Sequence, residues 1–252
     1  MRRAPYPHLQ RGNILFLILL AVVLFAALTY AITGSQRGGV KDISDEKADL
    51  LASQIIQQAT NIQQAVLRLK TTGGCTDAQI SFQPTASTPR SYANANAPAD
   101  KHCHIFDPAG AGVPFQEPPA EAFDPALSGQ TYYSGATNFF GHFLISKNIY
   151  IPRLGTDGGP TGTDLVILYP YLRSAVCTKI NQKLGTPSNI VWNTGNFDGA
   201  VYDGAFQFSN YNPPGSPPGG PFHSMCHMGK DGSGGDNQAA LFPIFYHVLL
   251  VR

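Results

Sequence analysis

Four cysteines and seven histidines are the residues of this chain with the most distinctive chemistry. Two cysteines lie directly beside histidines, in residues 102–104 (HCH) and 223–227 (HSMCH). Thiolate and imidazole groups are good zinc ligands, so these two stretches are candidates for a metal site. The candidate imidazole ligands are His102, His104, His223 and His227. No Cys-x-x-Cys spacing is present, however, and in an oxidising compartment the same cysteines would be consumed as disulfides.

The even number of cysteines predicts two disulfides. Four cysteines allow three pairings, and the sequence does not choose among them. We favour Cys75 with Cys103 and Cys177 with Cys226, because each pair would join the end or face of a predicted helix to a following loop. We therefore expect no bound metal and no other cofactor.

Motifs of the common catalytic classes are missing. The sequence has no Gly-x-Ser-x-Gly elbow, no His-Glu-x-x-His and no phosphate-binding glycine loop. His142 and His247 lie in apolar, strand-like stretches with no acid nearby to make either a base, so we interpret both as structural. Residues 231–237 (DGSGGDN) lack the ligand pattern of an EF-hand, and we predict a solvated turn there. We expect no enzymatic activity.

The composition narrows the remaining classes. Charged residues make up only 13% of the chain and the net charge is +1, which argues against an electrostatic partner such as a nucleic acid. Glycine and proline are enriched, and aromatic residues reach 11%, a mixture typical of an exported β-rich domain with many turns. The apolar fraction of 43% is sufficient for a sizeable core.

The strongest element signal is an apolar, uncharged run over residues 14–32. Its length matches a hydrocarbon core of about 30 Å, so a transmembrane helix is predicted over residues 13–33. The basic residues of the leader, residues 1–12, favour a cytoplasmic N-terminus. The alternative is a secretory signal peptide cut near Ala31, for which the apolar run is longer than usual. In both cases most of the chain leaves the cytoplasm.

The leader ends in Gln10-Arg11-Gly12 and the apolar run follows at once. This arrangement resembles the prepilin signal of type IV pilins and pseudopilins. The resemblance implies that a prepilin-type peptidase cuts between Gly12 and Asn13, after which the apolar helix packs in a filament or stays in the inner membrane. Leu17 stands where those proteins usually carry glutamate, which implies a tip, minor or non-filament role.

A glycine-rich hinge is predicted over residues 34–43, followed by a stem helix over residues 44–72. Its apolar positions alternate in steps of four and three residues: Ala48, Ala52, Ile55, Ala59, Ile62, Val66 and Leu69. One interpretation is an amphipathic helix packed on its own domain. The other is an oligomerisation seam between copies of the chain.

Residues 73–252 are predicted to form one extracytoplasmic domain. Strands are expected at residues 78–82, 139–145, 148–151, 164–169 and 244–251, a helix at 171–184, and a hairpin at 192–208. The last strand should be central in its sheet, because it is apolar throughout. Residues 83–101 and 212–221 are expected to be loops.

The predicted fold class is therefore α+β: an N-terminal transmembrane helix and an amphipathic stem helix packed on a mainly antiparallel β domain with long loops and one further helix. The predicted function is a pilin-like or pseudopilin-like subunit at the bacterial inner membrane, with its domain in the periplasm or outside the cell. Expected partners are the bilayer, the peptidase and other subunits, which would bind through the membrane and stem helices. The alternative is a tethered binding module unrelated to filaments, with an envelope enzyme as a weaker candidate.

Overall fold

The structure is a computed structural model, and it describes nine stretches of the chain. These are residues 18–26, 43–84, 91–129, 139–151, 153–155, 162–188, 201–206, 220–230 and 241–252. The chain divides into two compact units, residues 1–42 and residues 43–252. The second unit holds the sheet, both long helices and the two disulfides.

The predicted fold class is wrong in its first element. Among the described residues, no helix combines the length and the apolar character needed to cross a bilayer. Within the predicted span, the described residues 18–26 are helical. The other residues of the span 13–33 lie outside the described residues.

Helix α2 (Asp45–Thr71) is the longest element of the second unit. The Ser44 side chain caps its N-terminus by accepting a hydrogen bond from the backbone N–H of Lys47 at 3.3 Å. Gly74 lies just beyond its end, with a positive φ of 69° that favours glycine. These local signals explain why the helix begins and ends close to the bounds that the sequence predicts.

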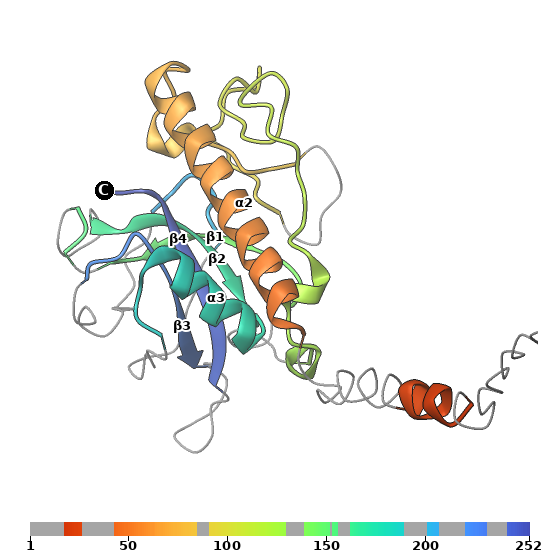
Figure 1. Cartoon of the computed structure of the whole chain (residues 1–252). Coiled ribbons are helices and arrows are strands. Elements are labelled where there is room, and N and C mark those ends of the chain that lie inside the picture. Colours follow the sequence, from red (N-terminus) through yellow and green to blue (C-terminus); the bar gives the residue numbers. More distant parts are fainter. Residues whose placement is uncertain are drawn as a thin grey trace, which may run out of the picture. The chain divides into compact units, whose positions relative to one another are not determined.

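One stripe of α2 packs into the core. Its buried residues are Ala48, Leu51, Ala52, Ile55, Ala59, Ile62, Ala65, Val66 and Leu69. This set contains every position of the predicted stripe, which therefore faces the domain's own sheet. The alternative interpretation of that stripe as a seam between copies is wrong, because its side chains are already covered. Figure 1 shows α2 crossing the sheet.

The sheet has four antiparallel strands in the order β1-β2-β4-β3. The strands are β1 (Leu144–Ile149), β2 (Asp164–Pro170), β3 (Ser224–Lys230) and β4 (Leu241–Leu250). All residues of β2 are buried, as are residues 242–250 of β4. The prediction of a central closing strand is confirmed, because β4 lies between β2 and β3 and is the only strand bonded to both.

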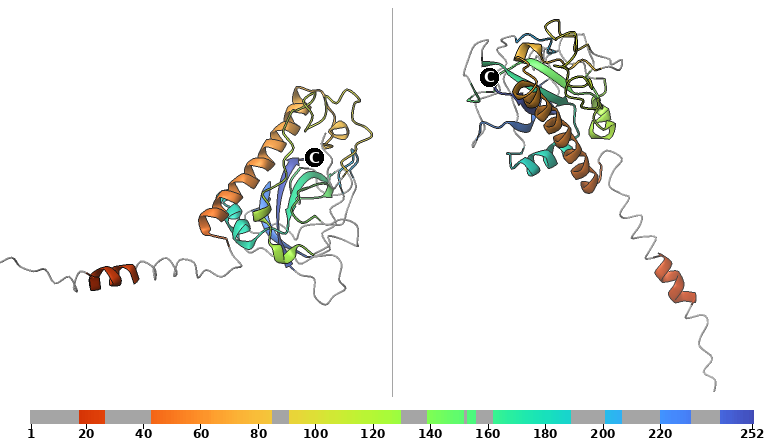
Figure 2. Two further views of the ribbon diagram at one scale, coloured as in Figure 1. Left: turned by 90° about the vertical axis from the view of Figure 1, so that its right-hand side faces the viewer. Right: turned by 90° about the horizontal axis from the view of Figure 1, so that it is seen from above.

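Helix α3 (Ser174–Leu184) lies beside α2 on the same face of the sheet (Figures 1 and 2). Two ion pairs join the helices: Lys179 Nζ is 2.7 Å from an Asp45 oxygen, and Lys183 Nζ is 2.8 Å from an Asp49 oxygen. The buried Asn181 side chain donates to the Cys226 carbonyl on β3 at 2.8 Å. The helix layer is thus attached to the sheet by polar contacts as well as by packing.

Several element boundaries differ from prediction. Residues 78–82 form a 3-10 turn, η1 (Asp77–Gln79), followed by a single bridge from Ser81 to His104. The two strands expected within 139–151 are one strand, β1, whose register shifts between Ser146 and Ile149. The Ser146 hydroxyl lies 2.7 Å from Asn148 Oδ1, and this local bond accompanies the irregularity.

The start of α3 also differs from prediction. The sequence places Pro170 at a helix start, yet Pro170 ends strand β2 and the helix begins at Ser174. Tyr171 between them has a φ of 63°, which no helical residue adopts. Its buried ring lies 4.5 Å, centroid to centroid, from that of Phe242 in β4. Tertiary packing of this ring has overridden the local helix signal.

Candidate functional site

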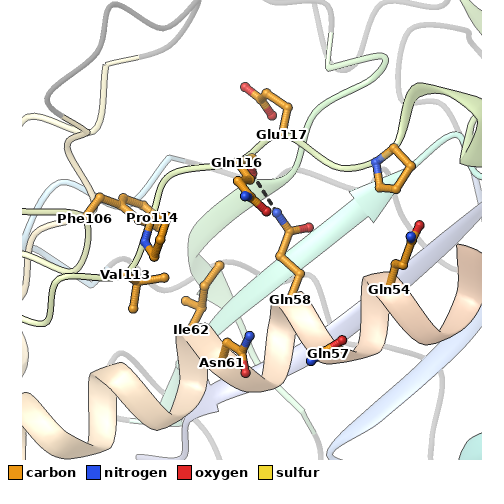
Figure 3. Close-up of a pocket in the computed structure, with 11 residues that line it drawn as sticks. Gln54, Gln57, Gln58, Asn61, Ile62, Phe106, Val113, Pro114, Gln116 and Glu117 are labelled. Carbon is orange, nitrogen blue, oxygen red and sulfur yellow. Dashed lines mark hydrogen bonds between the residues drawn. The ribbon is translucent and has the colours of Figure 1, made fainter.

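A hollow surface of the domain lies along α2. An extended segment, residues 112–119, runs beside the helix, and we call it the strap. Between the strap and α2 is a groove of about 420 Å³, which we call the amide groove (Figure 3). Its lining residues are Gln54, Gln57, Gln58, Asn61, Ile62, Phe106, Val113, Pro114, Gln116, Glu117 and Pro119.

Two hydrogen bonds from α2 hold the strap and its preceding turn in place. Gln58 Nε2 donates to the Gln116 carbonyl at 2.6 Å, and this bond is drawn in Figure 3. The Arg68 guanidinium donates to the Ala111 carbonyl. The Tyr169 hydroxyl, whose pKa is raised by burial, donates to Gln58 Oε1 at 3.2 Å. Both polar ends of Gln58 are therefore used inside the protein, and this residue positions the groove wall.

The groove carries very little charge. Among the described residues that line it, Glu117 alone is titratable. One Glu117 oxygen lies 2.9 Å from His142 Nδ1, so this carboxylate already has a partner in the chain. In the part of the chain that the structure describes, the lining holds no lysine or arginine. Its amide side chains can hydrogen-bond to a neutral molecule.

A second, shallower hollow of about 310 Å³ lies on the other side of Gln57 and Asn61, between α2 and α3. Its wall includes Ile56 and Leu184, together with Lys183, whose charge is paired with Asp49. The outer face of α2 thus combines uncharged amides with apolar side chains.

The predicted disulfides are present. Cys75 is bonded to Cys103, and Cys177 is bonded to Cys226, which is the favoured pairing. The first bond ties the end of α2 to the turn that follows residue 100. The second ties α3 to strand β3, the strand at one edge of the sheet.

The structure does not gather the four candidate histidine ligands. Within the described residues, one group of three has metal-ligand spacing: Cys75, Cys103 and His102, whose ligand atoms lie within 4.8 Å of one another. Both sulfurs of this group are oxidised in the disulfide. The His102 ring is engaged with Asp100, at 2.6 Å from Nδ1 to Oδ1. The contacts of this group are therefore those of a disulfide and of a hydrogen bond between His102 and Asp100.

Two further histidines lie in surroundings that lower their pKa. His227 is buried, and burial lowers its pKa to about 3. Its ring packs against Tyr246, with 5.8 Å between the centroids. His104 also has a lowered pKa, mainly because of burial. At neutral pH these environments favour the uncharged imidazole, as expected for structural histidines.

His247 is hydrogen-bonded to a serine on one side and to an amide on the other, a pattern similar to a catalytic triad of serine, histidine and carboxylate. The Gln63 side chain donates to the Val248 carbonyl at 2.9 Å, so its oxygen faces His247 Nε2 at 3.1 Å. An oxygen accepts only, so Nε2 carries the proton and Nδ1 accepts from the Ser224 hydroxyl at 2.5 Å.

The Ser224–His247–Gln63 arrangement lacks the carboxylate of a catalytic triad. An imidazolium formed at His247 would face a neutral amide where a triad has a carboxylate. Burial is the main cause that lowers the pKa of His247 to about 4, which makes it a weak base. Ser224, His247 and Gln63 therefore serve as a structural tether among β3, β4 and α2.

Some predicted sites lie outside the described residues. These are the processing residues Gly12 and Asn13, the glycine-rich residues 231–237, and most of the aromatic residues 192–211. Of the last group, Tyr202 is described and is buried, with its ring packed against Phe82 at 5.8 Å. Tyr202 is thus a core residue, not part of an exposed aromatic surface.

Sequence reasoning did not find the amide groove. The spacing of Gln54, Gln57, Gln58 and Asn61 places all four on one side of a helix, and that signal is readable in the sequence. The strap gave no such signal, because nothing in residues 112–119 indicates which surface they cover.

Comparisons with other proteins give no identification. No protein family, no curated protein and no solved structure matches this chain. Functional inference therefore depends on the residues and contacts described above.

Proposed function

We propose that this chain is a structural subunit of a bacterial secretion or pilus-type assembly, similar to type IV pilins or minor pseudopilins. The single observation that supports this proposal most is the packing of one long helix, α2, across an antiparallel sheet that is closed by the last strand. The amide groove adds support of a different kind, because its lining has no converging catalytic groups.

The proposed location is the outer side of the bacterial inner membrane. Two disulfides are typical of proteins that fold in an oxidising compartment. The leader that ends at Gly12 would be removed by a prepilin-type peptidase. The absence of a basic cluster in the domain sequence argues against a nucleic-acid partner.

Contacts with other subunits would use the outer face of α2, because its inner stripe is buried in the domain. Leu50 and Leu67 are exposed on this helix, at 57% and 44%. Between them the exposed residues are Gln54, Gln57, Asn61 and Gln64, which carry no charge. A face without charge can approach a copy of itself without repulsion between like charges.

The test is the mass of the mature protein. The full chain and a Gly12→Val variant should be produced in a bacterium that has a prepilin peptidase, extracted from membranes and weighed by mass spectrometry. We expect the native protein to begin at Asn13 and the variant to keep residues 1–12. A Gly34→Val variant is the matched control and should be processed normally. A Gly12→Val protein that also begins at Asn13, or a native protein that begins near Ala31, would refute prepilin processing.

A second function is favoured by the amide groove: a tethered binding module that is unrelated to filaments. Its volume of about 420 Å³ lies within the range of small-molecule sites. Gln58 holds the strap and Arg68 holds the turn before it through hydrogen bonds, so the groove is formed before any ligand arrives. Saturable binding of a small molecule, lost in groove variants, would support this function.

A further inference from the structure

We propose that the amide groove binds a neutral oligosaccharide. This inference rests on the second proposed function, the binding module, and names its ligand class. It does not depend on processing after Gly12.

The charges of the groove exclude ionic ligands. Cationic side chains are the strongest partners for a phosphate or carboxylate, and no lysine, arginine or histidine is among the described residues that line the groove. A metal ion of the calcium type needs several oxygen ligands with negative charge, whereas the lining offers only Glu117. That carboxylate is already 2.9 Å from His142 Nδ1. The ligand should therefore be uncharged.

Four amide side chains are available to such a ligand. Gln54, Gln57 and Asn61 come from successive turns of α2, and Gln116 comes from the strap (Figure 3). Within the described part of the chain, none of these four side chains has a hydrogen-bond partner, in contrast to Gln58. Each amide offers donors and an acceptor, which matches the mixed donor and acceptor character of neighbouring hydroxyl groups.

The groove also has an apolar side. Phe106, Val113 and Pro114 form one wall, and Ile62 lies at the floor between the amides. Sugar rings carry hydroxyls at their edges and C–H groups on their faces, so they can use both kinds of wall at once. The volume of about 420 Å³ leaves room for more than one sugar ring, because sites for small molecules begin near 300 Å³.

An extended peptide is the main competitor, since it is also neutral and rich in hydrogen-bonding groups. Peptides usually bind by adding a strand to a backbone edge that supplies N–H and C=O groups in alternation. Pro114 and Pro119 in the groove wall have no N–H to donate. On the opposite side, the backbone N–H groups of mid-α2 are used within the helix. Three of the eight strap residues, Pro114, Pro118 and Pro119, thus interrupt the N–H pattern that an added peptide strand needs, so the groove favours the sugar.

The test uses the full chain in mild detergent and isothermal titration calorimetry or ligand-observed NMR. The probes are maltose, cellobiose and N,N′-diacetylchitobiose, with trialanine and glucose 6-phosphate for comparison. We expect saturable binding of at least one neutral disaccharide and no comparable binding of the phosphate. Gln54→Ala and Asn61→Ala should each weaken that binding at least about fivefold, as expected for one lost hydrogen bond.

Gln64→Ala is the matched control, because Gln64 is an exposed amide of the same helix outside the groove lining and should bind as the native protein does. Trialanine binding that depends on Asn61 would overturn the saccharide but keep the binding module. Failure of every probe to bind would overturn both the saccharide ligand and the binding module. Binding of glucose 6-phosphate as tightly as a neutral sugar would overturn the charge argument.

Discussion

Gln63 of α2 holds His247 of β4 through a hydrogen bond of 3.1 Å between Gln63 Oε1 and His247 Nε2. The same amide donates to the Val248 carbonyl at 2.9 Å, so one side chain contacts two successive residues of the central strand. This pair fixes the tautomer of the imidazole and ties the helix layer to the sheet. These polar contacts join α2 to β4 in addition to the packing of the apolar stripe.

Replacing Gln63 with leucine should lower the free energy of unfolding by about 1–3 kcal/mol, because the buried His247 N–H and the Val248 carbonyl lose their partner. Urea denaturation followed by circular dichroism measures the effect. Gln64→Leu is the matched control: the same chemical change at the exposed next position should stay within about 0.5 kcal/mol. Equal stability of the two variants would mean that the Gln63 bonds contribute nothing.

Stability should fall as the pH is lowered from 7 to 4.5. Burial lowers the pKa of His227 to about 3 and that of His247 to about 4, so the unfolded chain takes up these protons first. Their stabilising effect is complete above pH 6.5 and is lost as the pH falls towards the folded pKa values. Asp164 acts in the opposite direction, because burial raises its pKa to about 6 and the folded state protonates first.

The two histidines outweigh Asp164, and the net loss should be of the order of 3 kcal/mol between pH 7 and pH 4.5. Denaturation curves at both pH values measure it. A His227→Met variant has no ring to protonate, so its stability should fall less over the same range. A variant as sensitive to pH as the native protein would show that His227 is not a source of the effect.

Removing the Cys177–Cys226 disulfide by a double alanine substitution should cost about 4 kcal/mol, because the closed loop spans 49 residues. The cost should show as a lower midpoint of thermal unfolding. The Cys75–Cys103 loop of 28 residues should contribute slightly less. Alkylation of the unfolded, unreduced protein should label no cysteine, and labelling of all four would contradict both disulfides.

Two aspartate substitutions on α2 separate folding from association. Ile55 is fully buried, so Ile55→Asp should unfold or strongly destabilise the domain by burying an unpaired charge. Leu50 is exposed, so Leu50→Asp should leave the melting temperature nearly unchanged. If the outer face of α2 mediates assembly, sedimentation should show weaker self-association for Leu50→Asp alone. A stable Ile55→Asp variant would contradict the packing of α2.

The sequence alone determined the features that depend on local periodicity and chemistry. The alternating steps of apolar residues along 48–69 can be satisfied only by a helix with one buried face, and α2 has that face against the sheet. An uninterrupted apolar stretch near the C-terminal end indicated a central strand, which is β4. The even number of cysteines indicated two disulfides, and the folded chain decided their pairing.

Tertiary structure decided what depends on contacts between distant residues. Strand β3 contains cysteine, histidine, methionine and glycine, which carry a weak strand signal, and it forms because β4 offers it a hydrogen-bonding edge. Tyr171 leaves the helix that its neighbours favour because its ring packs on Phe242. The amide groove depends on Gln58, which binds the strap 58 residues away, and on Arg68, which binds the preceding turn 43 residues away. Such pairings bring together residues that no local pattern relates, so only the folded chain shows them.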